Sequence, residues 1–357
     1  GFSINDWWVP NYTLHKLFAG LRDAYRLAGS KKALEVERKL ADWYETVVKN
    51  LDEANIQKLL DSEWGGLNET FVQLAEDTGD SRYLAIAEKY FNHKRIFDPL
   101  YEGRDQLDNL HANTQVPKIV GLAELYEQTG DAKYRRAVET FWDSVVNHRS
   151  FANGGHSDAE HFFNVSLFPQ RLGPKNSETC NINNMIRLTG HVFSWEPKAA
   201  QMDFVERALL NQILTQIGRK PGEYGYFLSQ APVAMKVFST PEGAWWCCVG
   251  TGMENPHHYA EQAYFHKGDT LWINLYIASR LNWKEQGVAL RQTTKFPESD
   301  ISKFTLKMKA PRTLNLKFRH PYWCEKPVVS VNGEPVEVAS EPSSYFTLSR
   351  EWKDGDT

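Results

Sequence analysis

The sequence predicts a mainly α-helical protein that ends in a β-sandwich. Over roughly the first two hundred residues, apolar side chains recur at helical spacing in segments long enough for helices. Past about Gly268 the pattern changes to alternation and to runs rich in β-branched and aromatic residues. We therefore predict a helical domain at residues 1–267 and a β-sandwich domain at residues 268–357.

A glycine recurs at nearly equal intervals in the helical part. Gly29, Gly79 and Gly130 lie fifty and fifty-one residues apart, and each separates two helical stretches. Glycine can end the first helix in the left-handed conformation, and the Ser or Asp that follows it can cap the second helix. The repeating unit is therefore a helical hairpin.

A looser turn at residues 194–197 adds a fourth hairpin, and a helix after Gly252 brings the expected number of helices to about nine. Such hairpins close into an (α/α)6 toroid, which needs twelve helices, or coil into an open solenoid. If the domain is a toroid, we expect its N-terminal part to be missing from this chain.

The predicted strands follow one another at short intervals. Val331-Asn332-Gly333-Glu334 is typical of a two-residue β-hairpin turn. The residues from Trp352 onward resemble the lead-in to another strand, so we expect the sandwich to be truncated at its C-terminus. The β-rich runs are 271–277, 304–308, 314–318 and 328–331.

Composition and charge argue against several classes of partner. Lys and Arg number 41 and Asp and Glu 45, and the resulting net charge of −4 argues against nucleic acid and anionic membranes. No apolar run approaches the length of a membrane span, and the chain opens without the basic and apolar segments of a signal peptide. The oligomeric state stays open, and a periplasmic or secreted location is preferred to a cytoplasmic one.

Three of the four cysteines lie in two short segments far apart in the chain, Glu178-Thr179-Cys180 and Trp245-Trp246-Cys247-Cys248. Three thiols and a carboxylate can complete a tetrahedral zinc site, because Zn²⁺ binds thiolate sulfur and carboxylate oxygen. Buried core cysteines, or a disulfide between the adjacent pair, would explain the same residues. We expect Cys324 in the core of the β domain.

Polar residues gather at the start of the first helix in each hairpin. In a toroid these helix ends lie on one side, so the side chains would converge on a pocket, although each alone could serve as a cap. Between the third and fourth hairpins, a glycine-hinged loop carries the acid Glu160, and long connections of this kind are often functional. The clusters are Tyr12 and His15; Asn68 and Glu69; His111, Asn113 and Gln115; and Asn181, Asn183 and Asn184.

With these motifs the chain resembles the β-L-arabinofuranosidases of glycoside hydrolase family 127 and its close relative family 146, and the details lean toward family 146. The resemblance extends over nearly the whole chain, and the order and approximate spacing of the motifs agree. The motifs are His15-Lys16 with Ala19-Gly20-Leu21, Leu110 to Gln115, Gly154-Gly155 through Glu160-His161-Phe162, Gly173-Pro174 through Glu178-Thr179-Cys180-Asn181, Glu206 to Leu209, and Trp246 to Gly250.

The resemblance implies an (α/α)6 barrel followed by β-sandwich domains, and a zinc-dependent exo-glycosidase that retains the anomeric configuration. The substrate would be an arabinose-containing oligosaccharide or polysaccharide. Cys247 would be the nucleophile and Glu160 the general acid/base. The choice of Cys247 over Cys248 rests on the family match and on an extended segment, in which successive side chains point to opposite faces so that only one can face the barrel mouth. Zinc would be held by Glu178, Cys180, Cys247 and Cys248, and the sugar would be contacted by His15, His111, Glu206 and Tyr226.

Other functions remain open at this stage. Trp245-Trp246 and His156-Ser157-Asp158 differ from the family 127 form and could select another pentofuranose-like sugar. A carbohydrate-binding protein with a purely structural zinc would have no need of Glu160. A sugar epimerase or an unsaturated-uronyl hydrolase on the same toroid would not need three cysteines close together.

Overall fold

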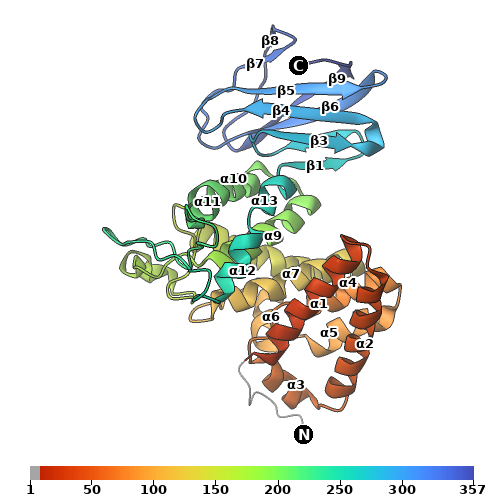
Figure 1. The fold of residues 1–357 in the computed structure, drawn as a ribbon, viewed down its shortest axis with the longest axis vertical. Helices are drawn as coiled ribbons and strands as arrows, with labels where there is room; N and C mark the ends of the chain where they lie inside the picture. The colour runs from red at the N-terminus through yellow and green to blue at the C-terminus, as the bar shows by residue number, and fades with distance from the viewer. Residues whose placement is uncertain (1–8) are drawn as a thin grey trace. The chain divides into compact units, whose positions relative to one another are not determined.

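The computed structural model describes residues 9–357, which divide into two compact units (Figure 1). The first unit holds the described residues up to Val192 together with Phe227–Lys236, and the second holds Phe193–Tyr226 together with Val237–Thr357. This division differs from the predicted boundary at residue 267, because the helix Ala199–Ala208 packs with the strand Ser344–Trp352 of the second unit. The boundary stays a prediction. Residues 1–8, on which the expectation about a signal peptide rests, lie outside the described residues.

Helical hairpins build the first unit, as the repeat predicts. The hairpins pair α1 with α2, α4 with α5 and α7 with α8, while α3 and α6 are short helices in the connections. The helix α9 begins in this unit. The bounds are α1 Pro10–Arg26, α2 Lys31–Val48, α3 Glu53–Leu60, α4 Leu67–Thr78, α5 Ser81–Tyr90, α6 Lys94–Tyr101, α7 Ala112–Thr129, α8 Ala132–Asp143 and α9 Thr179–Trp195.

The predicted turn chemistry is confirmed at each hairpin. Gly29, Gly79 and Gly130 have φ angles of 70°, 69° and 71°, in the left-handed region that glycine adopts without a steric penalty. The residue after each glycine caps the next helix: the side chains of Ser30, Asp80 and Asp131 accept hydrogen bonds from backbone N–H groups of the first turn.

The helices of each hairpin differ in burial. In α4 the residues from Leu67 to Leu74 are all buried, and in α7 those from Ala112 to Ala123 are buried. The partners α5 and α8 bury only one face. Because α1 contacts α4 and α4 contacts α7, the first helices of successive hairpins form the inner layer of the unit. Within residues 9–357 the helices outnumber the nine expected, because the sequence analysis missed short ones such as α3 and α6.

The second unit opens with helices and continues into strands. A π-helical turn at 209–213 follows α10, and α12 begins at Cys247. The helices are α10 Ala199–Ala208, α11 Leu214–Gln216, α12 Cys247–Glu254 and α13 His257–Glu261. The strands are β1 Tyr264–Lys267, β2 Thr270–Ile273, β3 Ser279–Trp283, β4 Val288–Thr294, β5 Ser302–Met308, β6 Arg312–His320, β7 Val329–Val331, β8 Glu334–Val336 and β9 Ser344–Trp352.

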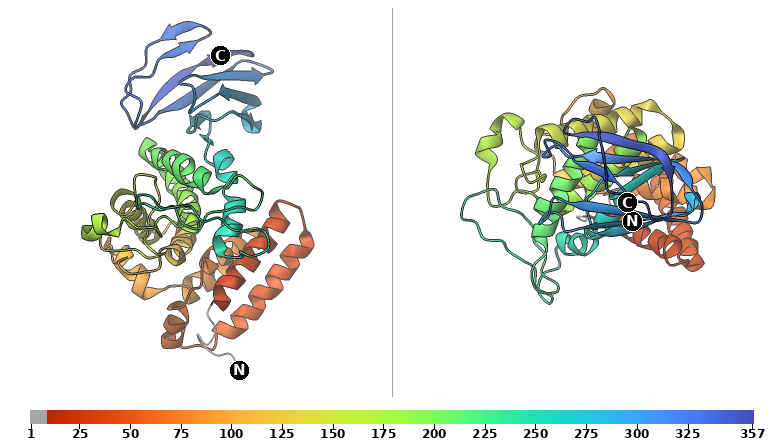
Figure 2. Two further views of the ribbon diagram at one scale, coloured as in Figure 1. Left: turned by 60° about the vertical axis from the view of Figure 1, so that its left-hand side comes forward. Right: turned by 90° about the horizontal axis from the view of Figure 1, so that it is seen from above.

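The strands gather at the C-terminal end of the chain (Figure 2), and two of their sheets share one hydrophobic core. The first sheet has the order β1-β2-β6-β9, with β2 and β6 parallel and the other pairs antiparallel; the second has the antiparallel order β3-β4-β5. Leu316 of β6 and Phe346 of β9 meet Leu290 of β4 and Leu306 of β5 in this core. The predicted sandwich is therefore confirmed as the architecture of the strands.

The β7-β8 hairpin confirms the Asn-Gly prediction, and one strand prediction is too long. Val331 pairs with Glu334, and Asn332 and Gly333 between them have φ angles of 55° and 90°, as a type I′ turn requires. The predicted strand 271–277 ends at Ile273, because the backbone of Asn274 leaves the ladder to pair with Ala263 and with a buried arginine.

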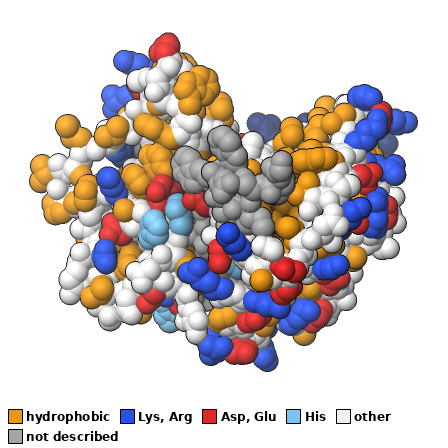
Figure 3. Space-filling view, turned by 90° about the horizontal axis from the view of Figure 1, so that it is seen from below, with side chains coloured by type: hydrophobic (Ala, Val, Ile, Leu, Met, Phe, Trp, Pro, Cys, Tyr) orange, Lys and Arg blue, Asp and Glu red, His pale blue; other side chains and the backbone are white. Residues whose placement is uncertain are grey.

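Acidic and basic side chains are interspersed on the face shown in Figure 3, as the near balance of charges predicts. Among the helices of residues 9–357, none combines the length and the apolar character that crossing a membrane requires.

Candidate active site

Polar residues from three inner helices meet in the first unit. Asn184 of α9 donates from Nδ2 to Oδ1 of Asn113 of α7 over 2.9 Å. Asn113 in turn donates from Nδ2 to the hydroxyl of Tyr12 of α1 over 3.4 Å. Because the three residues lie within the first six residues of α1, α7 and α9, the predicted convergence of these clusters is confirmed for them.

His15 lies buried against the turn that precedes α4. The backbone N–H of Gly66 donates to His15 Nδ1 over 3.1 Å, so the ring proton belongs on Nε2, which lies 4.0 Å from a carboxylate oxygen of Glu69. Burial, together with the charge of Lys16, lowers the pKa of His15 to about 3. His15 is therefore neutral at pH 7 and has a defined tautomer.

Glu160, the predicted acid, lies beside His111. Glu160 Oε2 is 3.8 Å from His111 Nε2, and the two side chains are 31% and 24% exposed. The backbone carbonyl of Glu160 accepts a 2.7 Å hydrogen bond from the N–H of Ala112, the first residue of α7. A partly exposed carboxyl group on a fixed backbone can reach a ligand and exchange protons with it.

The backbone around Glu160 is strained. Ser157, Ala159 and Glu160 have φ angles of 76°, 45° and 71°, and Ser177, which donates to the carbonyl of Ser157, has a φ of 55°. A non-glycine residue in this region costs on the order of 1–3 kcal/mol, and such residues cluster at functional sites. Asn181 Nδ2 donates to Ser157 Oγ over 2.7 Å and thereby links the strained segment to the start of α9.

The loop that carries Glu160 is tied down, in contrast to the hinge expected from its glycines. Arg149 forms ion pairs of 2.8 Å with both Asp105 and Asp108, and donates to the carbonyl of Phe163 over 2.6 Å. His156 is buried and stacks on Phe162 with ring centroids 5.6 Å apart. Gly154, with a φ of 89°, forms a turn of this anchored loop. The loop therefore positions Glu160 through ion pairs and backbone hydrogen bonds.

The adjacent cysteines open a helix. The sequence analysis placed Cys247 and Cys248 in an extended segment with side chains on opposite faces, whereas they are the first two residues of α12. Cys247 is exposed and Cys248 is buried, and their sulfur atoms are 3.9 Å apart. The two thiols therefore still differ in access, but the cause is the burial of one helix face. The partial positive charge at a helix N-terminus also favours a thiolate at this position.

A carboxylate and three thiols form a cluster of potential metal ligands. Glu178, Cys180, Cys247 and Cys248 each offer one ligand atom, and these atoms all lie within 4.8 Å of one another. Cys180, Cys247 and Cys248, all among the described residues, form no disulfide bond, so the disulfide alternative for the adjacent pair is not what the structure contains. Tetrahedral zinc with Zn–S bonds of about 2.3 Å places two sulfur atoms about 3.8 Å apart, which matches Cys247 and Cys248. The cluster could hold a metal ion, and its donors fit zinc.

Two further predicted sugar contacts lie in the second unit. Tyr226 is close to the exposed thiol, since Cys247 Sγ donates to its hydroxyl oxygen over 3.7 Å. The ring of Tyr226 also meets the ring of Trp246 edge to face at 5.7 Å. Glu206, in contrast, is buried, and its carboxylate oxygens pair with Arg319 and with the indole N–H of Trp323. The sugar contacts predicted for His15, His111, Glu206 and Tyr226 stay predictions.

Two family models match the chain almost end to end. Residues 1–261 match the catalytic domain of the GH127 β-L-arabinofuranosidases, and residues 270–357 match the middle domain of the same enzymes. The chain belongs to glycoside hydrolase family 127. The recognition made from the motifs is thereby confirmed for family 127, while the leaning toward family 146 stays a prediction.

Solved structures with the same fold include GH127 proteins. A GH127 β-L-arabinofuranosidase from Geobacillus stearothermophilus T6 has 19% identity and a TM-score of 0.77 over 97% of this chain and 60% of its own. A GH127 β-arabinofuranosidase has 22% identity and a TM-score of 0.75 over 97% and 58%. A protein described as a glycoside hydrolase has 21% identity and a TM-score of 0.75 over 97% and 63%.

The GH127 chain thus spans about three fifths of the length of these relatives. At these identities the likeness shows the fold, a helical domain followed by a small β domain. A comparison with curated proteins finds no match.

Among the charged pairs that the sequence analysis missed is one between inner helices of this GH127 chain. Arg187 of α9 forms an ion pair with Glu69, which is buried at the start of α4. Burial alone would raise the pKa of Glu69, but the charge of Arg187, the hydrogen bond from Arg187 and the neighbouring histidines together outweigh it and lower the pKa to about 2. The available signal was the spacing of three between Asn184 and Arg187, which places both on one face of α9.

Proposed function

We propose that this GH127 chain carries the active site of a retaining exo-glycosidase that releases β-L-arabinofuranose from plant-type glycans or glycoconjugates. Cys247 would act as the nucleophile, Glu160 as the general acid/base, and zinc as the cofactor. The observation that supports this most is the cluster of four ligand atoms within 4.8 Å, of which one sulfur, that of Cys247, is exposed. Membership of the family supports the class of substrate.

Zinc would be held by Glu178, Cys180, Cys247 and Cys248. It would supply one thing to the chemistry, which is to keep the bound thiols deprotonated at neutral pH, where a free thiol with a pKa of about 8.5 is mostly protonated. The protein contributes the position of the sulfur. Cys247 begins α12, and when its sulfur is a thiolate, the hydroxyl of Tyr226 at 3.7 Å becomes the hydrogen-bond donor. Cys248 is buried and would remain a ligand only.

In the first step Cys247 Sγ forms a bond to the anomeric carbon while the bond from that carbon to the departing oxygen breaks. Glu160 gives its proton to the departing oxygen. In the second step a water oxygen bonds to the same carbon, the carbon–sulfur bond breaks, and the Glu160 carboxylate takes a proton from the water. Two displacements at one carbon retain the anomeric configuration, as in glycosidases that use a carboxylate nucleophile.

Glu160 is suited to this role by where the structure places it. Its side chain is partly exposed, whereas Glu69 and Glu178 are buried, and His111 lies 3.8 Å away. The residues around Glu160 have strained, positive φ angles, and such residues cluster at active sites and ligand-binding sites. We propose that His15, His111, Glu206 and Tyr226 bind the sugar.

The proposal is tested with a panel of aryl pentofuranosides and with NMR of the first sugar released. We expect turnover of the aryl β-L-arabinofuranoside and initial release of the β anomer. Preference for a different pentofuranoside would show that the chain acts on a related sugar instead. Binding of arabinose-containing glycans without turnover would show that the chain is a carbohydrate-binding protein. Release of the inverted anomer would refute the cysteine mechanism.

A further inference from the structure

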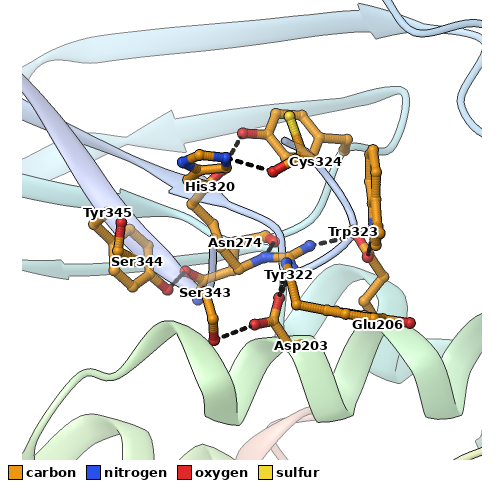
Figure 4. A network of polar contacts seen from close by, with 12 residues as sticks. Asp203, Glu206, Asn274, His320, Tyr322, Trp323, Cys324, Ser343, Ser344 and Tyr345 are labelled. Atoms are coloured by element: carbon orange, nitrogen blue, oxygen red, sulfur yellow. Dashed lines mark hydrogen bonds and ion pairs between the residues drawn. The ribbon is translucent and has the colours of Figure 1, made fainter. Parts of the chain in front are cut away.

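A turn after β6 presents two half-exposed aromatic side chains in the second unit (Figure 4). Tyr322 and Trp323 are 48% and 47% exposed. The turn is closed by the N–H of Cys324, which donates to the carbonyl of Pro321 over 3.1 Å, and a ring nitrogen of His320 pairs with the carbonyl of Cys324 over 2.7 Å. The sequence analysis expected Cys324 in the core of the β domain, whereas Cys324 belongs to this partly exposed turn.

The turn is anchored to α10 by a buried ion network. Arg319 at the end of β6 is fully buried, and its guanidinium pairs with both Asp203 and Glu206 of α10. The indole N–H of Trp323 donates to Glu206 Oε1 over 2.7 Å, and the backbone N–H of Tyr322 donates to Asp203 Oδ1 over 3.3 Å. The same two carboxylates thus hold the arginine and both aromatic residues.

Arg319 and Asp203 each have a further partner in this network. Arg319 Nε donates to the carbonyl of Asn274 over 2.6 Å, and the hydroxyl of Ser343 donates to Asp203 Oδ2 over 2.6 Å. Burying charges costs solvation, and well-packed apolar residues often stabilise a core equally well. What the network provides beyond stability is therefore a fixed orientation, because two carboxylates in set positions dictate where the indole and the turn must lie.

One face of the Trp323 ring is covered and the remainder is accessible. Phe296 stacks on Trp323 with ring centroids 5.4 Å apart and an angle of 14° between the planes. Since Trp323 is still half exposed, its accessible surface belongs to the other face and the ring edge. The guanidinium of Arg207 lies 5.8 Å from the centroid of Tyr322 and places N–H donors beside the aromatic pair.

We propose that Tyr322 and Trp323 form an aromatic platform that binds a further sugar ring of the glycan substrate. The proposal rests on the proposed function. A flat aromatic face, which carries negative charge density, attracts the C–H groups on one face of a sugar ring. The guanidinium of Arg207 beside the pair suits the hydroxyl groups of a sugar better than it suits an apolar protein surface. Glu206 is one of the proposed sugar contacts and accepts the hydrogen bond from the indole N–H, so the platform lies beside a proposed sugar contact.

The test compares Trp323→Ala with Trp43→Ala, both in the full chain and both combined with Glu160→Gln so that the ligand is not cleaved. Trp43 of α2 is a matched control, because it is also 47% exposed. Calorimetry measures binding of a short arabino-oligosaccharide ending in β-L-arabinofuranose and of methyl β-L-arabinofuranoside. We expect the ratio of the two affinities to fall about tenfold in Trp323→Ala, the size of one good aromatic contact, and not in Trp43→Ala.

Trp323→Phe keeps a smaller aromatic face and loses the bond to Glu206, so we expect it to recover much of the affinity. Equal losses in Trp323→Phe and Trp323→Ala, equal affinity ratios in Trp323→Ala and Trp43→Ala, or no oligosaccharide binding by Glu160→Gln alone would each overturn the platform. Turnover of the aryl arabinofuranoside by the unmodified chain is measured separately. Its absence would refute the proposed function, whereas a failed platform with normal turnover leaves that function standing.

Discussion

Replacing Gly65 by Ala tests how the turn before α4 holds His15. Gly65 has a φ of 61°, and a Cβ atom added there would lie 2.5 Å from His15 Nδ1 and 3.1 Å from its Cγ. Gly79 provides a matched control, because its φ is 69° and an added Cβ would meet nothing within 4 Å. The two substitutions therefore share the backbone strain and differ only in the clash with His15.

The expected magnitudes follow from that difference. An alanine forced into the left-handed region costs about 1 kcal/mol, which is the whole expected effect of Gly79→Ala. In Gly65→Ala the imidazole must also move, which breaks the hydrogen bond that it accepts from the N–H of Gly66. Losing a buried hydrogen bond costs about 2 kcal/mol more. We expect the free energy of unfolding to fall by about 1 kcal/mol in Gly79→Ala and by about 3 kcal/mol in Gly65→Ala. The midpoints of thermal unfolding should fall by roughly 3 °C and 9 °C.

Scanning calorimetry measures both midpoints, and kinetics on an aryl β-L-arabinofuranoside measure the sugar contact proposed for His15. We expect Gly65→Ala to raise KM and Gly79→Ala to leave it unchanged, because only the first substitution displaces the imidazole. Equal losses of stability in the two variants would refute the packing argument. A normal KM in a clearly destabilised Gly65→Ala would instead remove His15 from the sugar site.

Four further outcomes are expected. Glu160→Gln should slow substrates with poor leaving groups far more than activated aryl glycosides in the first step, and equal losses across leaving groups would place the acid elsewhere. Cys247→Ser should abolish turnover, and a haloacetamide or cyclitol analogue of β-L-arabinofuranose should label Cys247 in the mass spectrum; labelling of Cys248 would contradict the assignment. Elemental analysis should find about one zinc per chain, falling sharply in Cys180→Ser, and a fully active metal-free protein would rule the site out. Burial raises the pKa of Glu37 from 4.5 to about 7. Raising the pH from 4.5 to 7 should therefore lower the free energy of unfolding by about 1–2 kcal/mol after solvent screening. Urea titrations at the two pH values should show this loss in the unmodified chain and not in Glu37→Gln.

Much of the fold was predictable because its signals are local. The glycines at the hairpin turns and the caps that follow them depend on steric and hydrogen-bonding preferences within a few residues, and these predictions are confirmed at Gly29, Gly79 and Gly130. The Asn332-Gly333 turn is confirmed for the same reason. Short helices such as α3 were missed, because one or two turns carry too few apolar repeats to distinguish them from a loop.

The candidate site was predictable in its residue types and less so in its geometry. The candidate metal ligands were named from cysteine clustering and from a family resemblance, and the four ligand atoms lie together. The reason given for choosing between the two thiols was wrong, because Cys247 and Cys248 begin a helix. The loop around Glu160 was expected to hinge at its glycines, whereas Arg149 and its two aspartates anchor it.

The sequence by itself determined the repeating hairpins, the change from helices to strands, the turn residues and the set of side chains able to bind a metal. Each of these depends on neighbours a few residues apart, whose conformations are limited by sterics and by hydrogen bonds along the chain. Only the tertiary structure decided that Cys247 is exposed while Cys248 is buried, that Arg187 meets Glu69, and that Glu206 pairs with Arg319. Those outcomes join residues up to 118 positions apart, so they follow from how whole elements pack, which no local pattern specifies.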